Sequence, residues 1–383
     1  MLKVMPVFGT RPEAIKMAPL VKVLEKDAAI DCRVTVTAQH REMLDQVLQL
    51  FNIFPVHDLD IMRESQTLFQ VTGRVLEGLQ EVYTEEKPDL VLVHGDTTTT
   101  FVAALAAFYL QIPVGHVEAG LRTGNKYSPF PEEMNRHLAG ILADIHFAPT
   151  PGARKNLELE NIPANNIFVT GNTVIDALLA TVEKDYKFDD PLLDTIDFDQ
   201  SRVLLVTTHR RENLGGRMRE IYQALKDIIK QTPDVKIVFP VHKNPAVRRP
   251  VQEVLGGLER VHLIEPLDYR PFVNLMQKSH LVLTDSGGLQ EEAPALGKPV
   301  LVLRDTTERP EAVDAGTVKL VGAHREKVRE EALRLLNDAQ YYNKMAEAVN
   351  PYGDGKAARR ILEYIKYRHG LRNDPPQPFQ ATP

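Results

Sequence analysis

The sequence predicts two α/β domains, each built around a doubly wound parallel sheet. Short apolar runs rich in Val, Ile and Leu alternate with longer segments of helical period, as expected for buried parallel strands joined by helices. This alternation occurs twice, on either side of a polar, Asp-rich stretch at residues 184–201 that we interpret as the connection between the halves. A chain of 383 residues is also too long for one ordinary core. Two doubly wound domains with a cleft between them are therefore the predicted architecture.

The expected elements follow from this alternation in chain order. In the first half, the expected strands are residues 2–8, 32–37, 90–94, 114–117, 145–148 and 167–169. The helices expected between them include residues 13–25, 40–50 and 97–109. In the second half, the expected strands are residues 203–207, 236–240, 262–264, 281–284 and 300–303. A last helix is expected over residues 355–369, followed by a tail at 371–383 whose four prolines indicate disorder.

Composition excludes several classes of function. A net charge of −6 argues against a nucleic acid or an anionic membrane as the main partner. The single cysteine, Cys32, allows no internal disulfide, which fits a reducing cytoplasm. The N-terminal apolar segment is too short for a signal peptide, and the longest apolar run, residues 101–114, is too short to cross a bilayer. We therefore expect a soluble cytoplasmic protein.

Reactive side chains follow nearly every predicted strand. In the first half they are Gly9-Thr-Arg11-Pro-Glu13 with Lys16 one turn later, His94-Gly-Asp96-Thr97, and His116-Val-Glu118-Ala-Gly120. In the second half they are Thr208-His209-Arg210-Arg-Glu-Asn213, His242-Lys-Asn-Pro245, and Asp285-Ser286-Gly287-Gly288. Ligands of open α/β sheets bind beyond the carboxyl ends of the strands, so these segments are candidates for one site.

The Ser286-Gly-Gly288 turn is the predicted anion site. It joins a buried strand to a helix, and its glycines let the backbone approach a bound group closely. The free N–H groups of a first helical turn suit a phosphate. A charged loop containing Arg304 and Arg309 follows the next strand. These features predict a phosphorylated substrate.

Structural explanations account for only part of this pattern. Asp96 could cap the helix that follows it, and the acidic pair Glu132 and Glu133 could compensate a helix dipole. Arg11 and Glu118 have no comparable explanation. The sequence contains no dinucleotide or P-loop glycine motif, no nucleophile elbow, and no zinc or cysteine cluster. What remains are carboxylates, a histidine and arginines, a set that suits acid–base chemistry on a substrate with a phosphate leaving group.

Seven segments together resemble the bacterial non-hydrolysing UDP-N-acetylglucosamine 2-epimerases, in order across about residues 2–370. They are Gly9-Thr-Arg-Pro-Glu13, His94-Gly-Asp-Thr97, His116-Val-Glu-Ala-Gly-Leu-Arg122, Pro131-Glu-Glu-Met-Asn-Arg136, Thr208-His-Arg-Arg-Glu-Asn213, His242-Lys-Asn-Pro245 and Asp285-Ser-Gly-Gly-Leu-Gln-Glu-Glu292. The resemblance implies a GT-B fold, in which two Rossmann-like domains face a central cleft. The expected N-terminal domain is residues 1–171, completed by a C-terminal helix at 357–370, and the expected C-terminal domain is residues 172–356.

The resemblance also implies an activity. The family interconverts UDP-N-acetylglucosamine and UDP-N-acetylmannosamine by eliminating UDP to give 2-acetamidoglucal and adding it back, without cofactor or metal. The product supplies N-acetylmannosamine units for cell-surface polysaccharide, and family members suggest a homodimer. Two alternatives remain open: a GT-B glycosyltransferase and a hydrolysing UDP-N-acetylglucosamine 2-epimerase. A nucleotide-sugar sensor without catalytic activity is a third.

Site residues carry over by motif. The implied catalytic residues are Asp96, Glu118, Glu132 and His209. The implied UDP-binding residues are Arg11, Lys16, Phe272, Ser286, Gly287, Gly288, Glu292 and Arg309. A regulatory site for a second UDP-N-acetylglucosamine would use Gln39, Glu132, Arg210 and His242. At this site the chain has Glu42 and Ser65 where related members can carry Gln and Arg.

Overall fold

The computed structural model describes residues 1–38, 41–63 and 65–381. The chain divides into two compact units. Unit 1 comprises Met1–Ala180 and Tyr352–Gln380, and unit 2 comprises Thr181–Pro351. The sequence placed these two divisions after residues 171 and 356.

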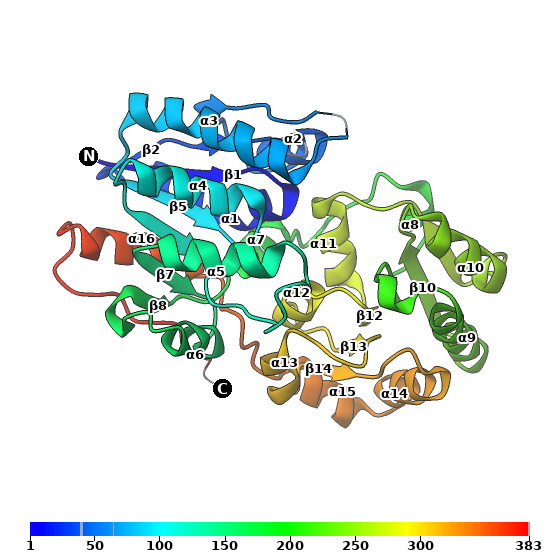
Figure 1. The fold of residues 1–383 in the computed structure, drawn as a ribbon. Coiled ribbons are helices and arrows are strands. Elements are labelled where there is room, and N and C mark those ends of the chain that lie inside the picture. Colours follow the sequence, from blue (N-terminus) through cyan, green and yellow to red (C-terminus); the bar gives the residue numbers. More distant parts are fainter. Residues whose placement is uncertain (39–40, 64, 382–383) are drawn as a thin grey trace. The chain divides into compact units, whose positions relative to one another are not determined.

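Unit 1 is built on a parallel sheet, in which the described residues form eight strands. The strands are β1 (Leu2–Phe8), β2 (Ile30–Cys32), β3 (Thr35–Val36), β4 (His57–Asp58), β5 (Leu90–His94), β6 (Val114–Val117), β7 (Ile145–Ala148) and β8 (Ile167–Val169). Their order is β4-β3-β1-β5-β6-β7-β8, and β2 also pairs with β1. The crossovers place the carboxyl ends of β1, β5 and β6 side by side at one edge (Figure 1).

Helices cover both faces of this sheet. They are α1 (Arg11–Lys26), α2 (Arg41–Leu50), α3 (Leu68–Glu86), α4 (Thr98–Tyr109), α5 (Glu132–Leu142), α6 (Pro151–Leu159), η1 (Ala164–Asn166), α7 (Thr173–Thr181) and α16 (Ala357–Arg368). On one face, α3, α4 and α5 pack side by side, and on the other face α1 packs between α2 and α16. Met5 and Val7 of β1 pack against the α3–α4 side, as the two-residue period of a strand requires.

The C-terminal helix α16 belongs to unit 1 although unit 2 precedes it in the chain. The N–H groups of Ala357 and Ala358 donate to Asp176, at 3.1 and 2.9 Å. Tyr364 stacks on Phe168 with ring centroids 4.3 Å apart. These contacts anchor the returning chain to β8 and α7.

The segment after α16 differs from the disorder expected for the tail. It contains no helix or strand among its described residues. Phe379 is nevertheless buried, and its N–H donates to the Val169 carbonyl at 2.9 Å. The guanidinium of Arg360 lies 5.4 Å from the Phe379 ring centroid. An apolar side chain therefore holds down a segment whose prolines and polar residues indicated disorder.

Unit 2 contains a second parallel sheet, with six strands among the described residues. They are β9 (Arg202–Thr207), β10 (Val235–Pro240), β11 (Val261–Ile264), β12 (Leu281–Thr284), β13 (Val300–Val302) and β14 (Val318–Leu320), in the order β11-β10-β9-β12-β13-β14. The helices are α8 (Pro191–Asp194), η2 (Arg211–Asn213), α9 (Gly216–Gln231), α10 (Pro245–Leu255), α11 (Tyr269–Lys278), α12 (Leu289–Ala295), α13 (Pro310–Asp314), α14 (Arg325–Asn337) and α15 (Ala339–Ala346). The order reverses at β9 and β12, so the carboxyl ends of these two strands form the switch point where ligands of such sheets bind.

The predicted class of two doubly wound parallel α/β domains is confirmed, and most strands match their expected ranges. The expected strand at 32–37 is wrong as a single element. The structure has β2 and β3 instead, which pair with β1 at Leu2–Val4 and at Val7–Phe8 respectively. Among the described residues, we find no helix whose length and apolar character would let it span a bilayer.

Candidate active site

In unit 1, Glu118 is the centre of a polar cluster at the carboxyl edge of the sheet. It directly follows β6 and adopts a φ of +61°, a conformation that costs free energy for a residue with a side chain. Lys16 of α1 donates to its Oε2 atom, and Asn172 Nδ2 donates to the same atom at 2.8 Å. His94 Nε2 lies 3.9 Å away. Donors from two other segments therefore fix one nearly buried carboxylate, with a buried histidine close by.

Asp96 lies in the neighbouring loop, after β5. Its carboxylate pairs with Arg136 of α5, and its backbone carbonyl accepts a hydrogen bond from Asn135 Nδ2 at 2.9 Å. Gly95 comes between β5 and Asp96 with a φ of +68°, and a Cβ atom there would lie 3.6 Å from Glu118 Oε1. The structure thus brings the loops of Asp96 and Glu118 together, as the sequence predicted.

Glu132 and Glu133 have different environments although they are adjacent. Glu133 is buried and accepts hydrogen bonds from the N–H groups of Thr123 and Gly124, at 2.9 and 3.0 Å. It also accepts a hydrogen bond from Arg136 at 3.2 Å, so it supports the partner of Asp96. Glu132 is the half-buried first residue of α5. Among the described residues, no hydrogen bond or ion pair joins it to Asp96 or Glu118.

Glu13 connects the loops that follow β1 and β5. It is buried, and it accepts hydrogen bonds from the N–H groups of Gly9 and Thr10 and from Thr97 Oγ1, at 3.1, 2.8 and 2.7 Å. Burial raises the pKa of Glu13, although these hydrogen bonds oppose the rise. Arg11, the first residue of α1, directly follows the two residues whose N–H groups Glu13 binds. No pattern in the sequence indicated this long-range role of Glu13.

In unit 2, the Ser286-Gly-Gly288 turn follows β12 as expected. A Cβ atom at Gly287 would lie 3.6 Å from Arg210 Nη2 and 3.9 Å from Arg309 Cζ, so two guanidinium groups flank the turn. Arg309 donates to the buried Glu291 at 2.5 Å, which fixes its direction. The helix after the turn, α12, has only seven residues, so the arginines supply the positive charge. The arrangement suits a diphosphate.

Glu292 lies beside this turn, and Phe272 lies on the helix α11 that contacts Glu292. Tyr269 of α11 donates to Glu292 Oε1 at 3.1 Å, and Phe272 is three residues further along α11. Residues at this spacing are neighbours on a helix surface. An acceptor for hydroxyl groups therefore lies near the arginine-flanked turn, and a half-buried aromatic ring lies on the helix that contacts it.

The loop bearing Arg309 is held by a second set of ion pairs. Arg304 donates to Glu212 at 2.6 Å and to Glu308 at 2.7 Å. Burial acts to raise the pKa of Glu308, but the hydrogen bonds from Arg304 outweigh it and lower this pKa to about 2. The loop is therefore fixed by charge and hydrogen bonding.

His209 follows β9 and faces Asp285, the residue after β12. Its Nδ1 atom lies 3.1 Å from Asp285 Oδ1, and its ring stacks near that of His242 with centroids 6.1 Å apart. Of the predicted regulatory residues, Arg210 and His242 lie in unit 2 and Glu132 lies in unit 1. Gln39 lies outside the described residues.

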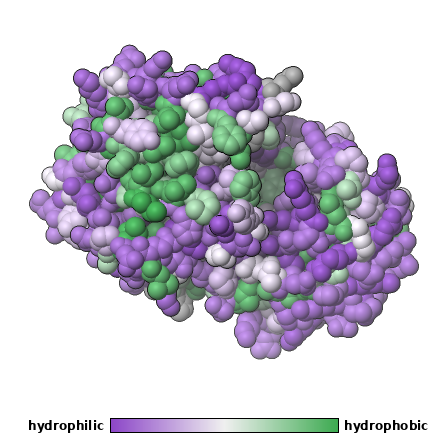
Figure 2. Space-filling view, in the orientation of Figure 1, coloured by the Kyte–Doolittle hydropathy of each residue, from purple (hydrophilic) through white to green (hydrophobic). Residues whose placement is uncertain are grey.

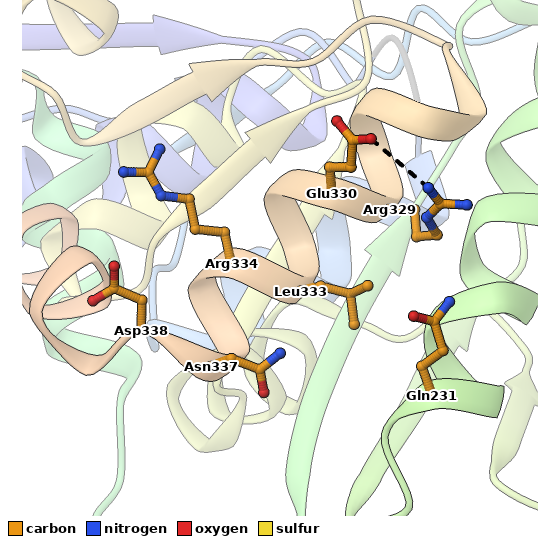
Figure 3. A pocket seen from close by; sticks show the side chains of 7 residues that line it. All are labelled: Gln231, Arg329, Glu330, Leu333, Arg334, Asn337 and Asp338. Atoms are coloured by element: carbon orange, nitrogen blue, oxygen red, sulfur yellow. Dashed lines mark ion pairs between the residues drawn. The ribbon is translucent and has the colours of Figure 1, made fainter.

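A separate pocket of ≈ 710 Å³ in unit 2 contains none of the predicted site residues (Figure 3). It is lined by Gln231, Arg329, Glu330, Leu333, Arg334, Asn337 and Asp338. Gln231 is the last residue of α9, just before β10, so the pocket lies toward the amino ends of the strands. Arg329 pairs with Glu330 at 3.7 Å. This pocket is therefore separate from the carboxyl ends of the unit 2 strands, where the predicted site residues lie.

Two Rossmann-like units, one with fixed carboxylates and one with an arginine-flanked glycine turn, define an enzyme of the GT-B class. The family model described as UDP-N-acetylglucosamine 2-epimerase matches residues 22–366. The chain belongs to this family, which confirms the resemblance to the UDP-N-acetylglucosamine 2-epimerases seen in the sequence.

Individual relatives extend over almost the whole chain. The UDP-N-acetylglucosamine 2-epimerase of Bacillus subtilis is 58% identical over 378 residues, covering 99% of this chain and 98% of the relative. The solved enzyme of Neisseria meningitidis, bound to UDP-GlcNAc, is 54% identical with a TM-score of 0.87, covering 95% and 99% of the two chains. The Methanocaldococcus jannaschii enzyme in complex with UDP-GlcNAc and UDP is 36% identical with a TM-score of 0.77, covering 96% and 100%.

Proposed function

We propose that this enzyme interconverts UDP-N-acetylglucosamine and UDP-N-acetylmannosamine by eliminating UDP and adding it back. Membership of the epimerase family carries this proposal. The two groups of side chains support it, because the reaction needs carboxylates for proton transfer and cations for a departing diphosphate. The product would supply N-acetylmannosamine units for cell-surface polysaccharide.

The chemistry explains why both groups are needed. The C2 hydrogen of the sugar has no adjacent carbonyl, so direct removal of its proton is slow. Loss of UDP from C1 together with the C2 proton gives 2-acetamidoglucal. A proton then returns to the opposite face of C2 while UDP adds back to C1. The proton and UDP are both regained, so the cycle balances without a cofactor.

We assign the proton transfers to the acidic residues of unit 1. Asp96, Glu118 and Glu132 form the acid–base set, without assignment of which removes the proton and which returns it. Lys16 and Arg136 would orient the first two, because their cationic groups contact Glu118 and Asp96. The contact of Lys16 with Glu118 leads us to place it with the carboxylates and not with the diphosphate.

We assign UDP to the residues around the glycine turn. Ser286, Gly287, Gly288 and Arg309 would bind the diphosphate, with His209 on the same side, and the resemblance adds Arg11 of unit 1. Glu292 would accept hydrogen bonds from the ribose hydroxyls, and Phe272 would pack near the uracil. The UDP-GlcNAc bound in the Neisseria meningitidis relative supports this ligand.

Incubation with UDP-N-acetylglucosamine alone in D2O tests the proposal. Deuterium should appear at C2, and UDP-N-acetylmannosamine should accumulate to a constant ratio. An unlabelled, unchanged sugar would favour a glycosyltransferase or a sensor. Continuous release of free N-acetylmannosamine at the turnover rate would instead identify a hydrolysing epimerase.

A second UDP-N-acetylglucosamine would act as an activator through Gln39, Glu132, Arg210 and His242. Arg210 also flanks Gly287, so its replacement would disturb substrate binding as well. His242→Ala is therefore the better test. It should reduce the sigmoidal dependence of the initial rate on substrate while UDP affinity stays within about threefold. A hyperbolic rate curve in the unaltered enzyme would exclude the activator.

We also propose a homodimer, through the outer face of α4 and α5 in unit 1. Two apolar stripes lie on these adjacent helices at helical spacing: Phe101, Leu105 and Phe108 on α4, and Met134, Leu138 and Ile141 on α5. Phe108 is 58% and Ile141 74% exposed. Figure 2 shows hydrophobic residues gathered over the region where Figure 1 draws these helices. Such a contiguous patch marks an interface.

Ile141→Lys should shift the molar mass in light scattering toward that of one chain, whereas Leu159→Lys, on α6, should not.

A further inference from the structure

Asp285 combines complete burial with direct contact to a half-exposed histidine. It is the first residue after β12, and its exposed fraction is 0%. Oδ1 lies 3.1 Å from His209 Nδ1, and Oδ2 accepts the N–H groups of His209 and Arg210, each at 3.0 Å. Asn213 Nδ2 also donates to Oδ2, at 3.2 Å. The function proposed above assigns no role to Asp285.

We propose that Asp285 is a positioning residue that holds His209 with Nδ1–H toward the carboxylate and Nε2 toward UDP. This inference rests on the proposed function, in which His209 lies on the diphosphate side. In this tautomer the neutral imidazole presents Nε2 to the ligand as an acceptor. When Nε2 is also protonated, the imidazolium presents a donor at the same atom.

The hydrogen-bonding capacity of the two groups supports this tautomer. A neutral imidazole has one donor and one acceptor nitrogen, whereas an ionised carboxylate only accepts. Burial acts to raise the pKa of Asp285, but its contacts with His209 and with backbone N–H groups outweigh this effect and lower it. Asp285 is therefore an ionised acceptor, and the nitrogen that faces it must carry a proton.

The other groups around His209 do not offer this interaction. The His242 ring is stacked near that of His209, with centroids 6.1 Å apart. The guanidinium of Arg210 donates to the Asp285 carbonyl at 3.3 Å and is itself only a donor. Among these neighbours, Asp285 alone is an anion. The carboxylate is therefore the group that orients the ring.

A purely structural role is the alternative, since Asp285 also binds two backbone N–H groups in the turn after β9. Asp285→Asn separates the roles, because its carbonyl oxygen can still accept from the backbone while its NH2 group faces Nδ1. This substitution favours the tautomer in which the proton is on Nε2. We expect kcat to fall about a hundredfold or more, while KM and UDP affinity stay within about threefold.

A double-mutant cycle in the full-length enzyme provides the decisive readout. If Asp285 acts through His209, Asp285→Asn should cost less than about threefold in kcat when His209→Asn is already present. Equal losses in both backgrounds would overturn the proposal. Tyr222→Phe is the matched control, since it removes the 2.8 Å bond to Thr208 in the same turn without touching His209. It should leave kcat within about threefold.

A measurement on the unaltered enzyme keeps the proposal testable if Asp285→Asn fails to fold. Nitrogen-15 NMR of the neutral His209 ring should show the proton on Nδ1, and a proton on Nε2 would overturn the proposal. This readout does not depend on turnover. Failure of C2 exchange in D2O would therefore count against the proposed function, whereas the wrong tautomer would count against Asp285 alone.

Discussion

Lys16 and Glu118 form an ion pair although they are 102 positions apart in the chain. Lys16 comes from the second turn of α1, and Glu118 comes from the residue directly after β6. The side chains are 19% and 7% exposed, so water screens the interaction only weakly. The resemblance placed Lys16 on the diphosphate side, whereas in the structure its ammonium group contacts a proposed catalytic carboxylate.

Lys16→Met should therefore damage turnover more than UDP binding. The substitution keeps most of the side-chain volume and removes the cation from Glu118. We expect kcat to fall about a hundredfold, which is within the usual contribution of a positioned acid–base group. UDP affinity, measured by calorimetry, should change less than about threefold. Lys22→Met on the same helix is the control, because Lys22 pairs only with exposed groups. A large loss of UDP affinity without loss of kcat would return Lys16 to the diphosphate.

Asp96→Asn should abolish most C2 exchange while the enzyme still binds UDP. The change removes the proton-accepting charge and weakens the pair with Arg136, but the Asp96 carbonyl can still bind Asn135. We expect a loss of about 10²- to 10⁴-fold in deuterium incorporation, measured by NMR. Asp45→Asn on α2 is the control, because its side chain is 43% exposed and pairs with Arg41 on the same helix. Exchange at a near-normal rate would remove Asp96 from the catalytic set.

The sheets could be predicted because buried parallel strands have almost continuous apolar sequences. β1, β5, β6, β7, β8 and β12 match their expected residues. The two-residue strand β4, His57–Asp58, was missed because it has neither length nor apolar character. β14 was also missed, since Lys319 interrupts the apolar sequence of this three-residue strand.

The site could be predicted only in part, because sequence patterns locate strand ends but not the partners that meet there. Asp96 and Glu118 were found from their positions after strands. Asn172 was not singled out, although it donates to Glu118 from 54 positions away. Glu133 resembled a second dipole-compensating acid next to Glu132, and its burial against Thr123 and Gly124 depends on how the loop folds.

Arg309→Ala should weaken the binding of UDP itself. Arg309 lies beside Gly287, and its loss would leave the buried Glu291 without this cation. A lost hydrogen bond to a charged group costs about 1.5–3 kcal/mol, or roughly ten- to one-hundredfold in the dissociation constant. Calorimetric titration with UDP measures the effect. Arg217→Ala, which removes an exposed arginine paired with Asp305, should leave UDP affinity unchanged. Unchanged UDP affinity in Arg309→Ala would contradict the assignment of the glycine turn.

Buried histidines lie on adjacent strands of unit 1. His116 and His146 are direct partners in the pairing of β6 with β7, and His94 ends β5. Burial is the main cause that lowers their pKa values, to about 4 for His94, about 3 for His116 and about 4 for His146. Each is therefore neutral in the folded protein at pH 5, where an exposed histidine would be charged.

This burial predicts that the enzyme loses stability as the pH falls from about 6.5 toward 4. In that range the unfolded chain binds protons at histidines whose ordinary pKa is 6.5, and the folded chain does not. The free energy of unfolding therefore decreases as pH falls, by about 2 kcal/mol for each such histidine at pH 5.

Urea unfolding midpoints at pH 8 and pH 5 measure the slope of stability against pH. His146→Gln should flatten it by removing one of these groups, whatever its effect at pH 8, whereas the exposed His324→Gln should leave it unchanged. An equal slope in His146→Gln and in the unaltered enzyme would show that His146 does not couple folding to protons.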